Sequence, residues 1–350
     1  MKTNSPYPGS ALSHGAVLAG VALSLVSQSL TAEPPQAEIS NGQIQARLFL
    51  PDARDGYYRG TRFDWSGVVA SLRFKGHDYY GPWFDRMHPK VNDFTYEGER
   101  VIAGPCSAIT GPAEEFQSNG SALGWDEAKP GGTFIKIGVG VLRKDSTNYS
   151  FARLYEMVDP GKWTLRTEAD AITFTHELSD AASGYAYVYR KSVRLTAGKP
   201  ELVLDHSLKN TGRHVIQTAT YNHNFLVLDR QPPGPDFTIT FPFPLRSSRP
   251  PNAELAQVRG SELAFARPLR DRDVVYAVLE GFGTSANDHQ VRIHNGKTGA
   301  GLKITGDRPL SRLAFWAMRN VLSVEPFITM TIEPGGEFAW RTAIEYDAGR

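Results

Sequence analysis

The residue best suited to proton transfer in this sequence is a histidine between two asparagines. His223 lies in the stretch TATYNHNFLVLD (218–229), whose alternation predicts a strand. Successive side chains of a strand face opposite ways, so His223 shares a face with Tyr221 and Phe225. An imidazole on an aromatic wall suits a sugar pocket, where C–H faces stack on rings and polar groups bind hydroxyls. The alternative is a histidine with a structural role in the core.

A carboxylate in apolar surroundings is the second candidate. Glu325 lies between Val324 and Pro326, near the carboxyl terminus. Burial raises the pKa of a carboxyl toward the range in which it exchanges protons near neutral pH. The alternative is a residue at a strand end that pairs with an arginine such as Arg319.

Arginines and aromatic residues gather in the segment DGYYRGTRFDWSG (55–67). Arg59 and Arg62 could bind vicinal hydroxyls or acids through their planar guanidinium groups, and Trp65 could stack on a sugar ring. The segment HDYYGPWFDR (77–86) repeats the aromatic theme. The alternative is a surface hairpin whose arginines only solvate it.

Two further stretches carry charge. Glu114 and Glu115 are adjacent, so on a strand they face apart and do not form one catalytic pair; such glutamates mostly lie on a solvated face.

Lys136 lies in FIKIGVGVLRK (134–144), which alternates like one continuous strand. Its face could line a substrate site, or Lys136 could guard a sheet edge against strand addition.

Composition and charge exclude several classes of protein. The 350 residues are 41% hydrophobic and 21% charged, with a formal net charge of +1, which gives no electrostatic reason to expect a nucleic-acid partner. The single cysteine, Cys106, excludes an intrachain disulfide and a cysteine-built zinc site. Because the histidines also show no paired spacing, we predict no structural metal.

The amino terminus resembles an export signal. Lys2 supplies a positive start, residues 16–26 form a short apolar run, and residues 29–32 (SLTA) end in a plausible cleavage residue. The apolar run is shorter than the ~20 residues that a spanning helix needs. We expect residues 1–32 to be a signal peptide and the protein to be exported, to a bacterial periplasm or outside the cell, with no stable membrane span after cleavage.

The rest of the chain is rich in short alternating stretches and in turns. From Ala37 onward the apolar pattern has period two, and 33 glycines and 23 prolines supply the turn residues. The best helix candidates, at 252–258 and 261–266, are short. The pattern predicts an all-β protein, a large antiparallel β-sandwich that forms one domain over residues 33–350.

Two motifs carry a family resemblance. The stretch KNTGRHVIQTATYNHNF (209–225), with His223, and the stretch SVEPF (323–327), followed by a Pro-Gly turn and Trp340, resemble the galactose mutarotase (aldose 1-epimerase) family. The resemblance implies the supersandwich of that family, holding a hexose in an open cleft, with His223 and Glu325 as the catalytic residues.

One position departs from the family. Where the family has an earlier histidine in a His-Gly pair, this chain has Lys136. A lysine can bind a ring or hydroxyl oxygen, but it offers no neutral acceptor unless it is strongly desolvated. The substitution argues against ordinary mutarotation and suggests an unusual or acidic sugar.

The resulting hypothesis is an exchange of anomers without a cofactor. Glu325 would take the proton of the anomeric hydroxyl while His223 protonates the ring oxygen, so that the ring opens and can close on either face. The residues expected to bind the sugar are Arg59 or Arg62, Lys136, Asn224 and Tyr221. The expected partner is a small sugar or the end of a glycan, and we expect a monomer.

Two other functions fit the same residues. The first is a non-catalytic carbohydrate-binding sandwich in which His223 is structural. The second is a hydrolase or lyase on a related fold. A hydrolase needs two carboxylates about 5–9.5 Å apart, and the sequence offers Glu114 or Glu115 as partners for Glu325.

Overall fold

Strands make up almost all of the regular structure, as the alternation predicts. The computed structural model describes residues 33–349, so the predicted signal peptide lies outside the described residues. From Pro34 onward the chain packs as one compact unit. Two 3-10 turns are present, η1 (Leu228–Arg230) and η2 (Ala286–Asp288). Over residues 33–349, no helix is long and apolar enough to cross a membrane.

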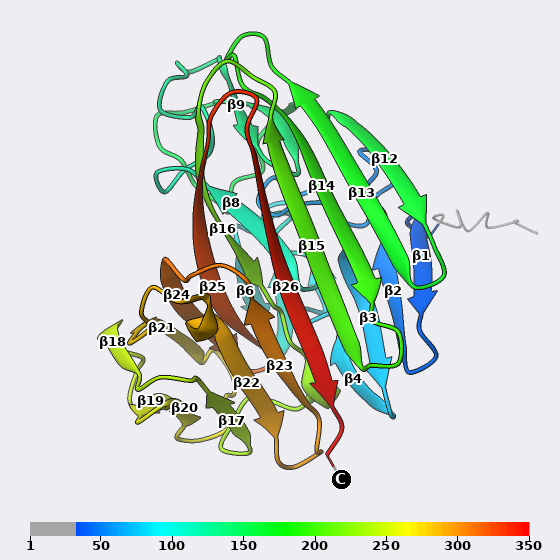
Figure 1. The fold of residues 1–350 in the computed structure, drawn as a ribbon. Coiled ribbons are helices and arrows are strands. Elements are labelled where there is room, and N and C mark those ends of the chain that lie inside the picture. The colour runs from blue at the N-terminus through cyan, green and yellow to red at the C-terminus, as the bar shows by residue number, and fades with distance from the viewer. Residues whose placement is uncertain (1–32, 350) are drawn as a thin grey trace, which may run out of the picture. The chain divides into compact units, whose positions relative to one another are not determined.

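The largest sheet has ten strands and forms one side of the sandwich (Figure 1). Its neighbours are all antiparallel. In spatial order they are β12 (Lys162–Thr167), β13 (Ala171–Ser179), β14 (Ala186–Leu195), β15 (Glu201–Asn210), β26 (Glu337–Asp347), β23 (Gly301–Gly306), β22 (Gln290–Asn295), β17 (Phe237–Thr240), β20 (Glu262–Phe265) and β19 (Ala256–Arg259). Strands β19 and β20 replace the two helices that the sequence suggested, because both segments alternate and pair with each other.

A six-stranded antiparallel sheet forms the other side. Its order is β18 (Arg246–Arg249), β21 (Val274–Glu280), β24 (Arg312–Met318), β25 (Val321–Ile332), β16 (Ile216–His223) and β8 (Ala113–Gln117). Strand β16, which carries His223, lies between β25 and β8. This sheet therefore contains both segments that the sequence singled out.

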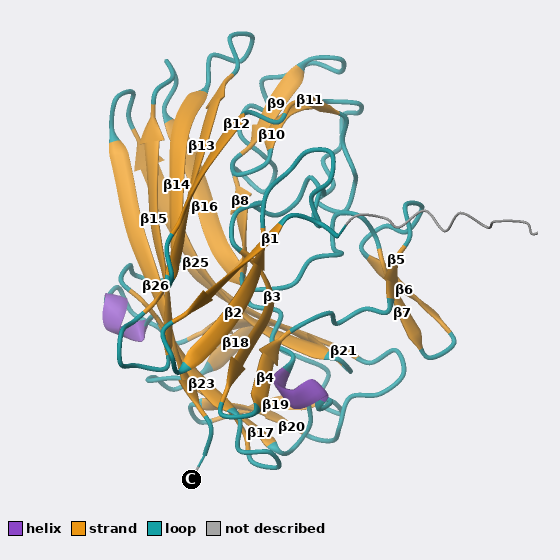
Figure 2. Cartoon of the chain, turned by 90° about the vertical axis from the view of Figure 1, so that its right-hand side faces the viewer, coloured by secondary structure: helices purple, strands orange, loops and turns teal. Residues whose placement is uncertain are grey.

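Three small sheets complete the fold. The first is β1 (Gln36–Ser40), β2 (Ile44–Phe49), β3 (Val68–Phe74) and β4 (His77–Tyr80). The second is β11 (Met157–Asp159), β10 (Gly140–Arg143) and β9 (Thr133–Lys136). The third is β5 (Arg86–Met87), β7 (Arg100–Ala103) and β6 (Phe94–Glu97), which stands to one side of the large sheets (Figure 2).

The two large sheets pack face to face through a shared apolar cluster. Alternate residues of β13, β14 and β15 are buried, as period-two patterning requires. Members of the cluster from the ten-stranded sheet are Tyr187, Tyr189, Leu208 and Trp340, and those from the six-stranded sheet are Phe116, Ile216, Ile328 and Met330. The all-β sandwich predicted from the sequence is confirmed.

The segment 134–144 is a hairpin and not the single strand that its alternation suggested. Strand β9 turns back into β10, and Gly140 pairs with Lys136. The turn needs Gly138, whose φ is +76° and whose position would bring an added Cβ to 2.5 Å from Asp64 Oδ1. Lys136 is 1% exposed, so it does not guard a solvent-exposed edge.

A substitution at Gly138 should show this constraint. Gly138→Ala places an L-residue in the left-handed region, at about 1–2 kcal/mol, and the contact with Asp64 should add about 1 kcal/mol or more. Gly131→Ala is the matched control, since Gly131 has φ +87° and open space around its Cβ position. Urea unfolding should show a larger loss of stability for Gly138→Ala, and equal losses would contradict the proposed contact.

Candidate functional site

The register of β16 against β25 places the two sequence-predicted catalytic residues opposite each other. Tyr221 pairs with Phe327, and the bridge between Leu226 and Leu322 keeps the same register further along. Two residues beyond Tyr221, this register sets His223 against Glu325, and His223 Nε2 lies 3.2 Å from Glu325 Oε1. Cross-strand neighbours of one sheet face meet in this way.

Aromatic rings hold the imidazole of His223. The ring stacks on Phe225 at a centroid distance of 3.7 Å, and the edges of Trp316 and Phe63 lie at 5.3 and 5.8 Å. Alternate residues of an extended strand lie roughly 7 Å apart, so the close stacking needs the turn at Phe225, whose φ is +42°. Within the described chain, Glu325 is the only polar group that contacts this imidazole, and His223 Nδ1 is buried without a hydrogen-bond partner.

Both residues line a cavity of about 280 Å³ on the face of the six-stranded sheet that points away from the ten-stranded sheet. Its walls combine aromatic rings with polar and charged side chains. The aromatic wall residues are Trp83, Phe94, Phe151, Tyr221, Phe225, Tyr276, Trp316 and Phe327, and the polar ones besides the pair are Arg62, Asp93, Ser107, Gln117 and Arg312. Such a lining is typical of a site for a small polar ligand with apolar faces.

Burial moves the two pKa values in opposite directions. Desolvation raises the pKa of Glu325 to about 7. Desolvation, helped by the positive charge of Arg62, lowers the pKa of His223 well below its ordinary value. Below about pH 7, the pair therefore carries one proton, on Glu325, while His223 is neutral.

A buried carboxylate beneath the cavity fixes Arg62. Glu115 accepts hydrogen bonds from Arg62 Nε at 2.7 Å and from the Tyr221 hydroxyl at 2.6 Å. Burial alone would raise the pKa of Glu115, but Arg62 and Lys136 lower it to about 2. The guanidinium of Arg62 also lies between the rings of Phe63 and Phe151, at 4.4 and 4.2 Å.

The other sequence-predicted binding residues have different positions. Arg59 is exposed, donates to the backbone oxygen of Arg54 and lines another cavity, so of the two arginines only Arg62 lies beside His223. Lys136 is behind Glu115, to which its Nζ donates at 3.3 Å. Asn224 is fully buried and donates to the backbone oxygen of Val324. Neither Lys136 nor Asn224 lines the cavity, whereas Tyr221 does.

The expectation of a solvated face for Glu114 and Glu115 is wrong. Both are fully buried, because β8 is covered on its two faces. Glu114 faces the ten-stranded sheet, where it pairs with Lys191 and His206 and accepts from Asn222. Each carboxylate has its own cations, as burial of a charge requires.

Sequence reasoning also missed part of the cavity wall. Arg312 and Trp316 alternate along β24, and Arg312 donates to the Tyr276 hydroxyl at 2.8 Å. The period-two pattern RLAFWAM placed them on one face, but nothing in it showed which face is open. The suggested contact of Glu325 with Arg319 is absent in residues 33–349; the guanidinium of Arg319 lies over Tyr96 instead.

No metal-binding cluster of three or more His, Cys, Asp or Glu occurs in the part of the chain that is described.

Comparison with known proteins gives a match of fold without a match of sequence. No protein-family model matches the chain, and no curated protein is similar to it in sequence. Solved structures do match over nearly the whole chain. The chain is similar to the Slr1438 protein from Synechocystis sp. PCC 6803, with 13% identity, 91% of this chain and 97% of that chain covered, and a TM-score of 0.52.

Two further structures link the fold to a family name. One is the GalM/aldose epimerase homologue from C. elegans, with 12% identity, 90% and 99% coverage and a TM-score of 0.51. The other is the galactose mutarotase related enzyme from Lactobacillus acidophilus, with 13% identity, 89% and 97% coverage and a TM-score of 0.50. The fold is that of the galactose mutarotase-like structures, and the resemblance that the sequence indicated is confirmed at this level.

The raised pKa of Glu325 predicts a pH-dependent stability. A carboxyl whose pKa is about 7 when folded and 4.5 otherwise stabilises the fold below pH 4.5, and this contribution is lost as the pH rises through 7. Glu325→Gln should therefore gain about 3 kcal/mol of stability relative to the wild type between pH 4 and pH 9. Unfolding in urea at several pH values measures the difference. Glu337→Gln, at an exposed position, is the control, and a constant difference for Glu325→Gln would contradict the shift.

Proposed function

We propose that this protein interconverts the anomers of an aldose in the cavity lined by His223 and Glu325. The observation that carries the proposal is the 3.2 Å contact between His223 Nε2 and Glu325 Oε1 on an open aromatic wall. Anomer exchange needs one group that gives a proton and one that takes a proton, and below about pH 7 the shifted pKa values give the pair a protonated carboxyl beside a neutral imidazole. The galactose mutarotase-like fold supports the same reaction class.

Ring opening needs two proton transfers in one site. The base takes the proton of the anomeric hydroxyl O1, the acid protonates the ring oxygen O5, the bond between C1 and O5 breaks and a C1–O1 double bond forms. Rotation about C1–C2 exposes the other face of the carbonyl. The reverse transfers then close the ring and return the pair to its starting state, so atoms and charge balance without a cofactor.

The directions of the two pKa shifts indicate which residue of the pair is the acid and which is the base. With the resting proton on Glu325, Glu325 acts as the acid in ring opening and His223 as the base, the reverse of the roles expected from the sequence. The open-chain state then has a carboxylate and an imidazolium in contact. Arg62, held by Glu115, orients the sugar, and the ring of Trp316, which lines the cavity, contacts its C–H groups.

The two alternative functions have less support. A hydrolase needs a second free carboxylate, but Glu114 faces the ten-stranded sheet, and both oxygens of Glu115 accept from Arg62, Tyr221, Lys136 and Gln117. A binding module would need no proton-sharing pair. Two other buried histidines, His176 and His289, bond to backbone oxygens as structural histidines do, whereas His223 does not.

Removal of either proton-transfer group should abolish the reaction. His223→Ala and Glu325→Gln should each lower the rate of anomer exchange by about 100-fold or more, since a positioned acid or base contributes about 10²–10⁴. Polarimetry on freshly dissolved α-anomers of a panel of hexoses and uronic acids measures the rate. His294→Ala and Glu337→Gln, which change the same residue types outside this cavity, should retain full activity.

Two results would decide against the catalytic roles. Undiminished rates in His223→Ala and Glu325→Gln would remove the pair from the mechanism. Sugar binding by calorimetry, with no acceleration of anomer exchange in the wild type for any sugar bound, would select the binding module.

The rate should fall on the alkaline side of neutrality. If Glu325 must carry the proton, kcat/KM declines as the pH rises through about 7, the pKa of this carboxyl. If Glu325 were the base, kcat/KM would rise through the same range. A pH profile measured from pH 5 to 9 against the uncatalysed rate at each pH distinguishes the two, and a rising limb would restore the roles expected from the sequence.

A further inference from the structure

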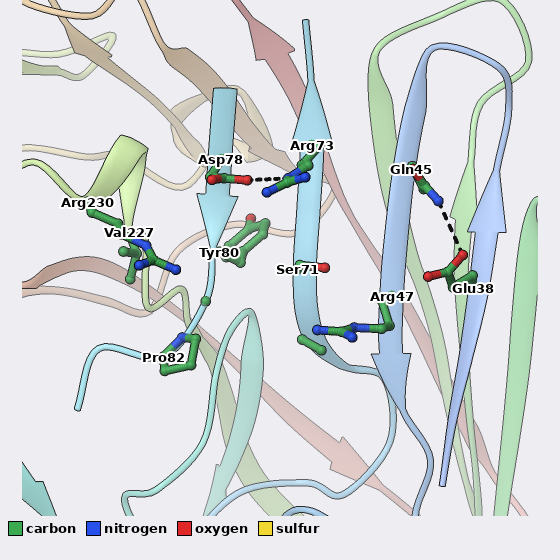
Figure 3. Close-up of a pocket in the computed structure, with 12 residues that line it drawn as sticks. Glu38, Gln45, Arg47, Ser71, Arg73, Asp78, Tyr80, Pro82, Val227 and Arg230 are labelled. Carbon is green, nitrogen blue, oxygen red and sulfur yellow. Dashed lines mark hydrogen bonds and ion pairs between the residues drawn. The ribbon is translucent and has the colours of Figure 1, made fainter. Parts of the chain in front are cut away.

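A second cavity, of about 360 Å³, opens on the sheet β1–β4 (Figure 3). It shares no lining residue with the cavity of His223 within the described chain. In β2, Ile44, Ala46 and Leu48 point into the core, so the pleat directs Gln45 and Arg47 to the outer face. The polar residues of this face are therefore not required for core packing.

Three arginines line this cavity, and two of them have no acidic partner among the residues that the structure describes. Arg73 pairs with Asp78 at 2.7 Å. Arg47 stands opposite Glu38 in the ladder, yet its side chain points toward Ser71, and Glu38 accepts from Gln45 at 3.2 Å (Figure 3). Across residues 33–349, neither Arg47 nor Arg230 forms an ion pair.

The backbone at Arg230 is strained in a way that directs its side chain to the cavity. Asp229 and Arg230 have φ values of +48° and +55°, a region that L-residues other than Asn and Asp rarely adopt. The carboxylate of Asp229 holds this turn, since it accepts from the backbone N–H of Asp78 at 3.0 Å and contacts His77 Nδ1 at 2.8 Å. Arg230 extends from η1 toward β4, while Arg47 extends toward β3 (Figure 3). Strain that presents a side chain in this way is typical of ligand sites.

The side chains of this cavity fit an acid group attached to a sugar. A guanidinium fork binds a carboxylate or a sulfate ester through two parallel hydrogen bonds. Glu38, Asp78 and Ser71 provide acceptors for neighbouring hydroxyls. The chain's net charge of +1 gives a strand of closely spaced phosphates little attraction.

We propose that Arg47 and Arg230 form an anion-binding site for the carboxylate or sulfate groups of an acidic glycan. The site is separate from the His223–Glu325 pair, and it holds the glycan through its acid groups while the sheet contributes hydroxyl contacts.

Binding of defined oligosaccharides to the full-length protein tests the proposal. Calorimetry would use a uronate tetrasaccharide, a sulfated tetrasaccharide of neutral sugars, and the methyl-esterified form of the uronate. We expect at least one acidic ligand to bind, the esterified form to bind at least 10-fold more weakly, and Arg47→Ala and Arg230→Ala each to weaken binding by 10-fold or more. Arg259→Ala, an exposed arginine on β19, is the matched control and should bind as the wild type does.

Each outcome of the binding experiment either supports or overturns the anion-binding site. Whichever acidic ligand depends on the two arginines identifies the source of the acid group. No binding of either acidic ligand, equal binding of the esterified form, or dissociation constants within twofold of the wild type in both variants would overturn the site. Tighter arginine-dependent binding of a single-stranded oligonucleotide would overturn the choice of a glycan.

The variants distinguish a failure of the proposed anion-binding site from a failure of the proposed anomer exchange. His223→Ala should lose anomer exchange and keep the binding of the acidic tetrasaccharide. Arg47→Ala and Arg230→Ala should lose that binding and keep anomer exchange on a monosaccharide. Loss of both properties in either set of variants, with the fold intact by circular dichroism, would contradict two independent sites.

Discussion

Strands β16 and β25 keep one register from the pair Ile216–Ile332 to the bridge Leu226–Leu322, and the site depends on that pairing. Because side chains of a strand alternate, this single register sends Tyr221 and His223 to the cavity and Asn222 toward the core. A shift by one residue would exchange the two sets. The contact of His223 with Glu325 is thus a consequence of ordinary ladder geometry, with the turn at Phe225 added to close the aromatic wall.

The two glutamates of β8 show how the fold separates its charges. Glu115 takes Arg62 and Lys136 on the cavity side, and Glu114 takes Lys191 and His206 between the sheets. Each carboxylate stays ionised because these partners, Lys191 for Glu114 and Arg62 with Lys136 for Glu115 foremost, compensate for the loss of water. Glu325 has no such close cation within the described residues, and burial leaves its pKa near 7. Glu114 and Glu115 have close partners that keep them ionised, whereas Glu325 has no close cation among the described residues. Glu325 can therefore exchange a proton.

Polar groups thus have different roles in the cavity of His223 and on the outer face of β1–β4. Around His223, aromatic rings pack against one buried acid–base pair, which suits proton transfer at a single carbon. On the outer face of β1–β4, Arg47 and Arg230, which form no ion pair within residues 33–349, remain exposed to solvent, which suits the recognition of charge. The acidic sugar expected from Lys136 loses that basis, because Lys136 is buried behind Glu115 and does not line the cavity. The proposed anion-binding site depends on Arg47 and Arg230 instead.

The sequence by itself determined the all-β class, because period-two alternation between Gly- and Pro-rich turns leaves few other ways to bury the apolar faces. It also determined which side chains of β16 share a face, and so the chemistry that His223 could do. Only the tertiary structure decided that Glu325 is the cross-strand neighbour of His223, that Arg62 and not Arg59 lies beside them, and that Glu114 and Glu115 are buried. Those facts depend on strand order and on which sheet face is covered, and local alternation carries no information about partners that are about 100 residues apart.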